Sequence, residues 1–336
     1  MQREKLCFRV GISALALATL IKVCSSGVLN TVAEKMSAPE AMGVLLFLES
    51  GRIVKPANPT QPQPVQSEET LPEQTQPEEM PAQPVFGEAD AGLVDVNNYS
   101  GKEADVVELL GKPLSWQLKQ AQPTVLILHS HGTESYTKNE DYKETTKYRT
   151  EDINYNVVSV GSRLARVLES GGVQVVHDQI MQDSPSYSKS YSHARAQTKE
   201  NLEKYPSVSL VLDIHRDAVE NKSGQQVKFT VETEKGTAAQ LMLVVGTDAR
   251  LSHADWPENM ALAVKLHALL EKNYPGICRP ISFRAQRFNQ DLSPGALIIE
   301  VGSAGNSRQE ALLAAEILGE TILELSQGTA TADSTR

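Results

Sequence analysis

The sequence of 336 residues contains only three cysteines, and their spacing fits neither a disulfide framework nor a cysteine metal site. Positive charge is also scarce, because 32 Lys and Arg stand against 42 Asp and Glu, for a formal net charge of -10. A nucleic-acid surface needs clustered basic residues, so nucleic-acid binding has no support. No glycine-rich phosphate loop and no Gly-x-Ser-x-Gly elbow occurs, so the common nucleotide-binding motifs and an elbow-type serine esterase are not indicated.

Long hydrophobic runs are missing as well. The longest, residues 10–23, is interrupted by Lys22 and follows a basic N-terminal stretch. It is shorter than the roughly 20 residues that cross a bilayer comfortably, so a cleaved signal peptide and an uncleaved anchor both fit it. We expect an uncleaved signal anchor over residues 1–30, with the rest of the protein outside the cytoplasm. A short apolar patch predicts a juxtamembrane helix within residues 31–55.

The composition then changes twice along the chain. Residues 56–95 are rich in Pro, Gln and Glu and offer little to bury, which predicts a disordered linker that gives reach. Residues 120–326 have the periodic pattern of a folded domain, and residues 327–336 are expected to form a disordered tail. The sequence therefore predicts one catalytic domain on a membrane tether.

Within that domain, apolar strand patterns alternate with amphipathic helix patterns. This alternation predicts an α/β fold, a three-layer sandwich around a mixed, mostly parallel sheet. The expected strands cover residues 124–129, 173–177, 208–214, 227–233, 240–246 and 296–301. The expected helices cover residues 156–168, 192–204, 256–272 and 308–325.

Three of the apolar strands carry ionisable side chains at or near their ends. His131 follows the expected strand 124–129 and precedes a glycine. His215 follows the strand 208–214 and stands between Asp213 and Asp217, and Glu300 lies inside the strand 296–301. Open α/β sheets keep their sites at the carboxyl ends of their strands. Two histidines and a carboxylate are a common catalytic zinc set, and a further glutamate can act as general base. The pattern favours a zinc hydrolase.

We assign His131 and His215 as metal ligands and Glu300 as the general base. A carboxylate in an apolar strand must pair with a cation, bind a metal or keep a raised pKa suited to proton transfer. A buried ion pair with Arg284 or Arg287 is the alternative for Glu300. A barrel-type amidohydrolase also uses His-x-His at a strand end, but it needs two more metal-site histidines, and only His215 qualifies.

The third ligand is not fixed by spacing. Three acidic residues are candidates, namely Glu134, Glu151 and Asp152, and we favour Asp152 because it stands just before the helix at 156. Glu134 is then expected to hold the substrate or to assist as a second acid. His129 is expected to orient a ligand, and the remaining histidines are expected to be structural or exposed: His177, His193, His253 and His267.

These residues together resemble the zinc N-acetylmuramoyl-L-alanine amidases, whose pattern is His-Gly after a strand, an acidic ligand near the first helix, a later strand ending in histidine and a late glutamate. Over residues 120–326 the chain more specifically resembles the stage II sporulation protein P family of endospore-forming Firmicutes. The motifs that carry this resemblance are His131-Gly-Thr-Glu-Ser-Tyr136, Asn156-Val-Val-Ser-Val-Gly161, Ser186-Tyr-Ser-Lys-Ser-Tyr191 with Arg195, Asp213-Ile-His-Arg-Asp217, and Asn289-Gln-Asp-Leu-Ser293.

The resemblance implies a membrane-anchored zinc peptidoglycan hydrolase that acts in septal wall degradation and engulfment during endospore formation. It implies N-acetylmuramoyl-L-alanine amidase activity with a further endopeptidase activity, and a partner hydrolase like stage II sporulation protein D. Its expected place is the intermembrane space of the sporulating cell. Tyr187, Tyr191 and Arg195 are candidates to line a substrate groove. The alternative function is a catalytically inactive wall-binding or scaffold protein of the same fold.

Overall fold

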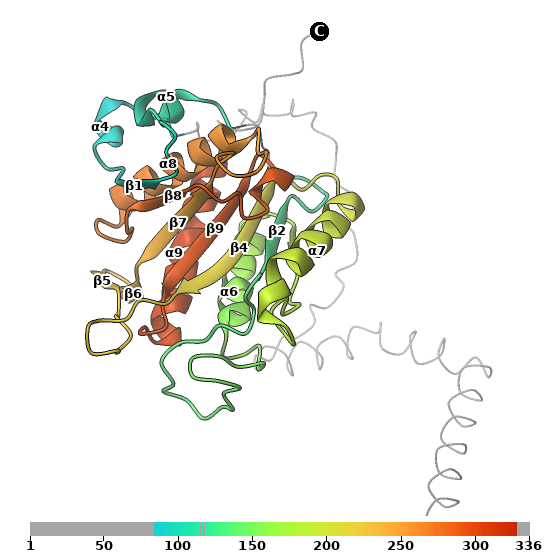
Figure 1. The fold of residues 1–336 in the computed structure, drawn as a ribbon. Helices are drawn as coiled ribbons and strands as arrows, with labels where there is room; N and C mark the ends of the chain where they lie inside the picture. The colour runs from blue at the N-terminus through green and yellow to red at the C-terminus, as the bar shows by residue number, and fades with distance from the viewer. Residues whose placement is uncertain (1–83, 115, 117, 328–336) are drawn as a thin grey trace, which may run out of the picture. The chain divides into compact units, whose positions relative to one another are not determined.

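The computed structural model describes residues 84–114, 116 and 118–327, which contain a seven-stranded mixed sheet of order β1-β8-β7-β9-β4-β2-β3 (Figure 1). All neighbouring strands are parallel except β7 and β9. The sheet therefore consists of two parallel blocks that run in opposite directions. Its strands are β1 (Val96–Tyr99), β2 (Val125–Leu128), β3 (Val175–His177), β4 (Leu210–Asp217), β7 (Leu241–Gly246), β8 (Ile281–Arg284) and β9 (Ala296–Ser303).

Helices cover both faces of this sheet. One face and its helices form the main hydrophobic core, which includes α6 (Val157–Ser170), α8 (Trp256–Asn273) and α9 (Arg308–Ser326). The other face packs against α7 (Ser190–Lys204) through a smaller cluster. The predicted three-layer α/β fold with a mostly parallel sheet is confirmed. The shorter elements are α4 (Glu88–Ala91), α5 (Val106–Gly111), the hairpin β5 (Thr230–Thr233) and β6 (Gly236–Ala239), and the 3₁₀ turns η1 (Tyr187–Lys189) and η2 (Gln290–Leu292).

Strand β2 shows why the central strands are apolar throughout. Its four side chains are all buried: Val125 and Ile127 point into the main core, whereas Leu126 and Leu128 point toward Ala194 of α7. Strands of a parallel sheet that is covered on both faces need apolar residues at every position. Each fully buried aliphatic side chain contributes about 1.5–3 kcal/mol. This packing holds the end of β2, where His131 follows, in a fixed place.

The main helices begin where the sequence supplies a cap. Asn156 caps α6 by accepting a hydrogen bond from the Val158 amide, and Ser307 and Glu310 form a capping box at the start of α9. Gly171 stands at the C-terminal end of α6. The four predicted helices are found within a few residues of their expected bounds.

The start of the folded domain differs from the prediction. Helix α4 lies inside the end of the predicted linker, and β1 pairs with β8 along the sheet edge, ahead of the expected domain start at residue 120. β1 has the sequence Val-Asn-Asn-Tyr and is mostly exposed, so backbone pairing rather than apolar burial holds it.

The segments expected at the two ends lie outside the described residues. These are the anchor over 1–30, the juxtamembrane segment over 31–55, the linker up to residue 83 and all but the first residue of the tail. Among the helices of the described ranges, none has the length and apolar character needed to cross a membrane.

Candidate active site

Three adjacent parallel strands, β9, β4 and β2, bring the predicted site residues together at their carboxyl ends. His215 is directly opposite Glu300 in the register of β4 and β9, so their side chains leave the same face of the sheet. That face is the one covered by α7, because the alternate residues Leu212 and Ile214 point into the main core. The site therefore lies on the α7 side of the sheet.

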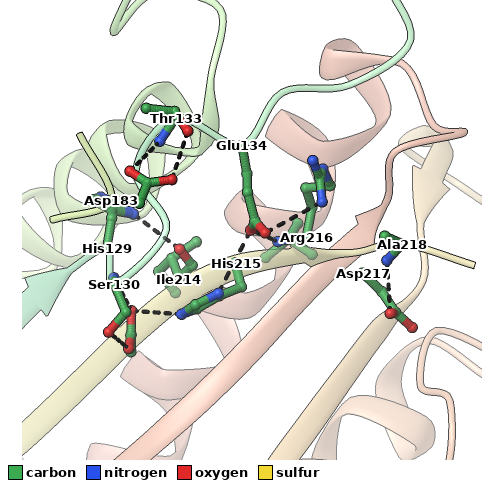
Figure 2. A network of polar contacts seen from close by, with 12 residues as sticks. His129, Ser130, Thr133, Glu134, Asp183, Ile214, His215, Arg216, Asp217 and Ala218 are labelled. Atoms are coloured by element: carbon green, nitrogen blue, oxygen red, sulfur yellow. Dashed lines mark hydrogen bonds and ion pairs between the residues drawn. The ribbon is translucent and has the colours of Figure 1, made fainter. Parts of the chain in front are cut away.

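His215 is buried between two carboxylates (Figure 2). Its Nε2 lies 2.9 Å from Asp213 Oδ1 and its Nδ1 lies 3.6 Å from Glu134 Oε2. The Nε2 contact is an ionic one, since that nitrogen has no aligned hydrogen-bond partner. Burial alone would lower the pKa of His215, but the two carboxylates outweigh it and raise the pKa well above the usual value. Without a bound cation, the two carboxylates favour the protonated form of this ring.

The turn after β2 is fixed on both sides by aspartates. Ser130 donates to Asp213 from its amide at 2.8 Å and from its hydroxyl at 2.5 Å. Thr133 donates to Asp183 from its amide at 3.1 Å and from its hydroxyl at 2.6 Å. His131 lies between these two anchored residues, so its backbone position is set by charge-assisted hydrogen bonds.

His131 is enclosed by three rings. It stacks on Tyr187 with a centroid distance of 4.5 Å and an angle of 8°, and it meets the edges of His215 at 5.3 Å and Tyr191 at 5.4 Å. Its Nδ1 is buried without a hydrogen-bond partner among the described residues. Burial, and then the charge of His215, lower the pKa of His131, so this imidazole is neutral and able to act as a ligand.

Glu134 faces His215 and is held by arginines. Its carboxylate accepts hydrogen bonds from the Arg216 amide at 3.1 Å and from the Arg216 Nη1 at 3.3 Å, and it lies 3.5 Å from Arg149 Nη2. Burial tends to raise the pKa of Glu134, but Arg216 and His215 lower it below its usual value. The group stays ionised, so it does not suit the predicted role of a second acid.

Arg216 is itself almost completely buried and bonded along its length. Its Nε donates to the Ser135 carbonyl at 2.9 Å, and its Nη2 donates to the Tyr148 carbonyl at 2.9 Å. The guanidinium therefore links β4 to two points of the 133–149 segment and to the Glu134 carboxylate. Removal of one partner of such a buried pair leaves an uncompensated charge.

Glu300 has no ion pair within the described part of the chain. Its Oε2 is buried without a hydrogen-bond partner, and burial raises the pKa of the carboxyl above its usual value. The two arginines considered as ion-pair partners of Glu300 are engaged elsewhere, because Arg284 lies over the Tyr99 ring and Arg287 pairs with Asp291. A carboxyl with a raised pKa beside the histidines is suited to taking up and returning a proton.

His129 belongs to a different cluster. Its Nδ1 lies 3.0 Å from the Ile214 carbonyl and its Nε2 lies 2.9 Å from His177 Nε2. A ring N–H must donate to the carbonyl, so the His129 Nε2 accepts and His177 donates. Gly161 of α6 packs directly on this pair, because a Cβ there would come within 2.7 Å of the His129 ring. His129 thus supports the backbone next to His215, as its predicted orienting role requires.

Asp152 is not beside the histidines. It is exposed, and its carboxylate accepts hydrogen bonds from the amide and the side chain of Asn154 at 3.0 Å each. These are local bonds of the turn that leads into α6. Glu151 is also exposed and accepts a bond from Ser184. The structure replaces Asp152 with Glu134 as the carboxylate next to His131 and His215.

The predicted groove residues separate into two kinds. Tyr187 and Tyr191 both contact His131, as described above. Arg195 is instead engaged in a two-point ion pair with Asp291, with N–O distances of 2.8 and 2.7 Å. Its guanidinium is committed to holding α7 against the 290–292 turn, so it does not suit recognition of a peptide carboxylate.

Whether these residues suit a metal ion can be tested on their unsatisfied atoms. No three metal-ligating side chains of the described ranges already converge as a complete metal site. Two of the site's side chains nevertheless carry a buried polar atom without a hydrogen-bond partner, His131 Nδ1 and Glu300 Oε2, and the Nδ1 of His215 faces the Glu134 carboxylate at 3.6 Å. Buried polar groups are costly to leave unpaired, and two imidazoles with a carboxylate are the donors that zinc prefers. The donor types of these residues suit a zinc ion.

Several supporting residues were given no role from the sequence, namely Ser130, Arg149, Asp183, Asp213 and Arg216. Asp213 had a usable signal, because a residue two positions before His215 in a strand shares its face. The others had none, since they come from loops or depend on contacts between distant segments.

A family model described as Stage II sporulation protein P matches residues 48–323 of the chain. The chain is 29% identical over 216 residues to Stage II sporulation protein P of Bacillus subtilis (strain 168). The aligned residues cover 60% of this chain and 50% of the relative. The chain therefore spans about half the length of that curated relative.

Similar solved structures include two amidases. N-acetylmuramoyl-L-alanine amidase AmiC2 of Nostoc punctiforme is 15% identical with a TM-score of 0.36, over 60% of this chain and 95% of that one. The N-acetylmuramoyl-L-alanine amidase from Clostridium difficile 630 is 17% identical with a TM-score of 0.36, over 61% of this chain and 94% of that one.

Proposed function

Because the chain belongs to the stage II sporulation protein P family, we propose that it is a zinc-dependent peptidoglycan hydrolase that cleaves the amide bond between glycan and stem peptide. The observation that carries this proposal is the meeting of His131, His215, Glu134 and Glu300 at the ends of three neighbouring strands. The amidase pattern recognised in the sequence supplies the class of bond. A further endopeptidase activity on the stem peptide belongs to the same proposal.

The zinc ligands are His131, His215 and one carboxylate. Glu134 and Asp213 both lie close to His215, but they differ in how their oxygens are occupied. Asp213 accepts short bonds from Ser130 at 2.5 and 2.8 Å, whereas the contacts of Glu134 with the arginines are longer, at 3.1–3.5 Å. Glu134 is therefore the third ligand, and Asp213 fixes the orientation of the His215 ring, as carboxylates behind metal-bound histidines commonly do.

The reaction is the addition of water to an amide. Zinc, when bound, supplies Lewis acidity that polarises the carbonyl and makes a water molecule acidic. Glu300 takes a proton from the attacking water as its oxygen bonds to the carbonyl carbon. Glu300 then gives this proton to the amide nitrogen, the carbon–nitrogen bond breaks, and a carboxylic acid and an amine result. The buried surroundings of Glu300 keep its pKa high enough for both transfers.

The experiment measures zinc and cleavage together. Full-length protein with stoichiometric zinc should release stem peptides from purified peptidoglycan, detected by mass spectrometry, and a chelator should stop the release. Glu134→Gln should lose most of the zinc, whereas Asp213→Asn, the matched control, should retain more of it. If zinc-replete protein cuts no amide bond in peptidoglycan, the inactive wall-binding or scaffold function becomes the better description.

The cellular setting completes the proposal. An N-terminal signal anchor would hold the enzyme in the membrane, with the catalytic domain outside the cytoplasm in the intermembrane space of the sporulating cell. There the chain would act in septal wall degradation and engulfment, together with a hydrolase like stage II sporulation protein D. Fractionation and protease accessibility of protoplasts test this topology, and a soluble, processed main species would contradict the anchor.

A further inference from the structure

Tyr191 lies beside His131 in the candidate active site. It is half-buried in the first turn of α7, and its ring meets the His131 ring edge-on at 5.4 Å and 87°. Its hydroxyl is near enough to interact electrostatically with His215, Asp213, Glu300 and Glu134. No hydrogen bond to that hydroxyl is found among the described residues. A polar group that lies close to a site and has no partner of its own is available to a ligand.

The position of Tyr191 is fixed from behind by the segment that leads into η2. Asn289 Nδ2 donates to the Tyr191 carbonyl at 2.8 Å, and the Phe288 ring lies 6.0 Å from the Tyr191 ring. Phe288 and Asn289 have φ angles of 50° and 62°, a backbone region that side chains other than glycine rarely occupy. The Arg195–Asp291 ion pair fastens the same segment to α7 one turn further along. Strain that the surroundings maintain often marks a functional site.

We propose that the Tyr191 hydroxyl donates a hydrogen bond to the carbonyl oxygen of the scissile amide. This inference rests on the proposed function and adds a residue to it. As the water oxygen bonds to the carbonyl carbon, the carbonyl oxygen gains negative charge, and the phenol proton stabilises that charge without leaving Tyr191. Glu300 still carries the proton from water to nitrogen, so the reaction balances as before. A donor held rigidly in advance needs no reorganisation during the reaction, which is why such groups are effective.

Tyr187 provides a matched control, since it also contacts His131. It lies flat on the imidazole and is largely exposed, with the Arg149 guanidinium 4.8 Å from its ring centroid. Its contact with the site is made by the ring face, so loss of its hydroxyl should lower kcat less than loss of the Tyr191 hydroxyl. The two tyrosines thus separate a role of the hydroxyl from a role of the ring.

The test compares full-length, zinc-loaded Tyr191→Phe and Tyr187→Phe with the unaltered protein on a soluble muramoyl peptide. Tyr191→Phe should lower kcat by about 10²–10³-fold, the loss seen on removal of one donor of this type, with KM, bound zinc and Tm unchanged. Tyr187→Phe should lower kcat by a much smaller factor than Tyr191→Phe. Asn289→Gly keeps the phenol and suits the positive φ but removes the bond to the Tyr191 carbonyl, so kcat should fall by a smaller factor.

A kcat for Tyr191→Phe within about threefold of the unaltered protein overturns the inference, and so does a rise in KM at constant kcat, because that would show ground-state binding only. In either case the unaltered protein is active, and the proposed function stands. If the unaltered protein carries zinc yet cuts no muramoyl amide, both proposals fail together. Should Tyr191→Phe fold poorly, unchanged kcat in a well-folded Asn289→Gly overturns the inference.

Discussion

Two histidine pairs lie close to the same strand ends but have different surroundings. His215 lies between two carboxylates that raise its pKa, beside His131, whose own pKa is lowered by burial. The rings of His129 and His177 face each other, and burial lowers their pKa values to about 4 and about 3. His129 and His131 are only two residues apart. The comparison shows that neighbouring carboxylates, rather than the histidine or its place at a strand end, make a chemical site.

The largest difference between the two pairs should appear in zinc content and activity when one histidine is removed from each. His215→Ala should abolish most zinc binding and activity, because it deletes a proposed ligand of a site with few ligands to spare. His177→Ala should keep both, although it also removes an imidazole, a half-buried one. Zinc measured by atomic absorption and peptide release from peptidoglycan give the readouts. Equal zinc content in the two variants would remove the distinction between the pairs.

Glu300→Gln should lower turnover by at least about 100-fold while zinc stays bound, since the amide cannot accept the water proton. The change keeps the size of the side chain, so Tm should hardly move. Single-turnover kinetics and zinc content check this expectation. Near-normal turnover would make Glu300 a structural residue and place the proton carrier elsewhere.

Arg216→Met should destabilise the zinc-free protein by about 3–5 kcal/mol, the loss typical of breaking a buried ion pair from one side. The Glu134 carboxylate would then be buried beside fewer cations. Urea unfolding measures the change, and Arg163→Met is the control, because its ion pair with Glu316 is solvent-exposed on both sides. Similar losses in both variants would show that Arg216 has no special part in holding Glu134.

His177 and His215 should also differ in the sign of their contribution to the pH dependence of stability. The pKa of His177, at about 3, lies below its value in the unfolded chain, about 6.5, so its contribution is full above pH 6.5 and is lost as the pH falls toward 3. The raised pKa of His215 acts oppositely and stabilises below pH 6.5. Urea unfolding with chelator at pH 7.5 and 5.5 should therefore show a smaller acid-induced loss in His177→Gln than in the unaltered protein. An equal acid-induced loss of stability in the two proteins would contradict a lowered pKa of His177 in the folded state.

Much of this arrangement could be predicted, and the rest could not for identifiable reasons. β2, β4 and β9 are long enough and apolar enough to be recognised, and they carried His131, His215 and Glu300 to the right edge. Asp152 was favoured because it precedes a helix, but the segment between β2 and α6 has no periodic pattern that shows which acid turns inward. The Glu134 side chain turns inward because Arg216, which is far away in sequence, is buried against it. β1 escaped notice because backbone pairing needs no apolar signature.

The position of β9 has a consequence for when the proposed hydrolase could first act. β9 is the last strand of the described residues, yet it lies in the middle of the sheet between β7 and β4, and it supplies Glu300. A chain that is still being synthesised, or that has lost its C-terminal part, lacks both Glu300 and the strand that joins the two halves of the sheet. If Glu300 carries the proton as proposed, cleavage requires a polypeptide that is complete through β9.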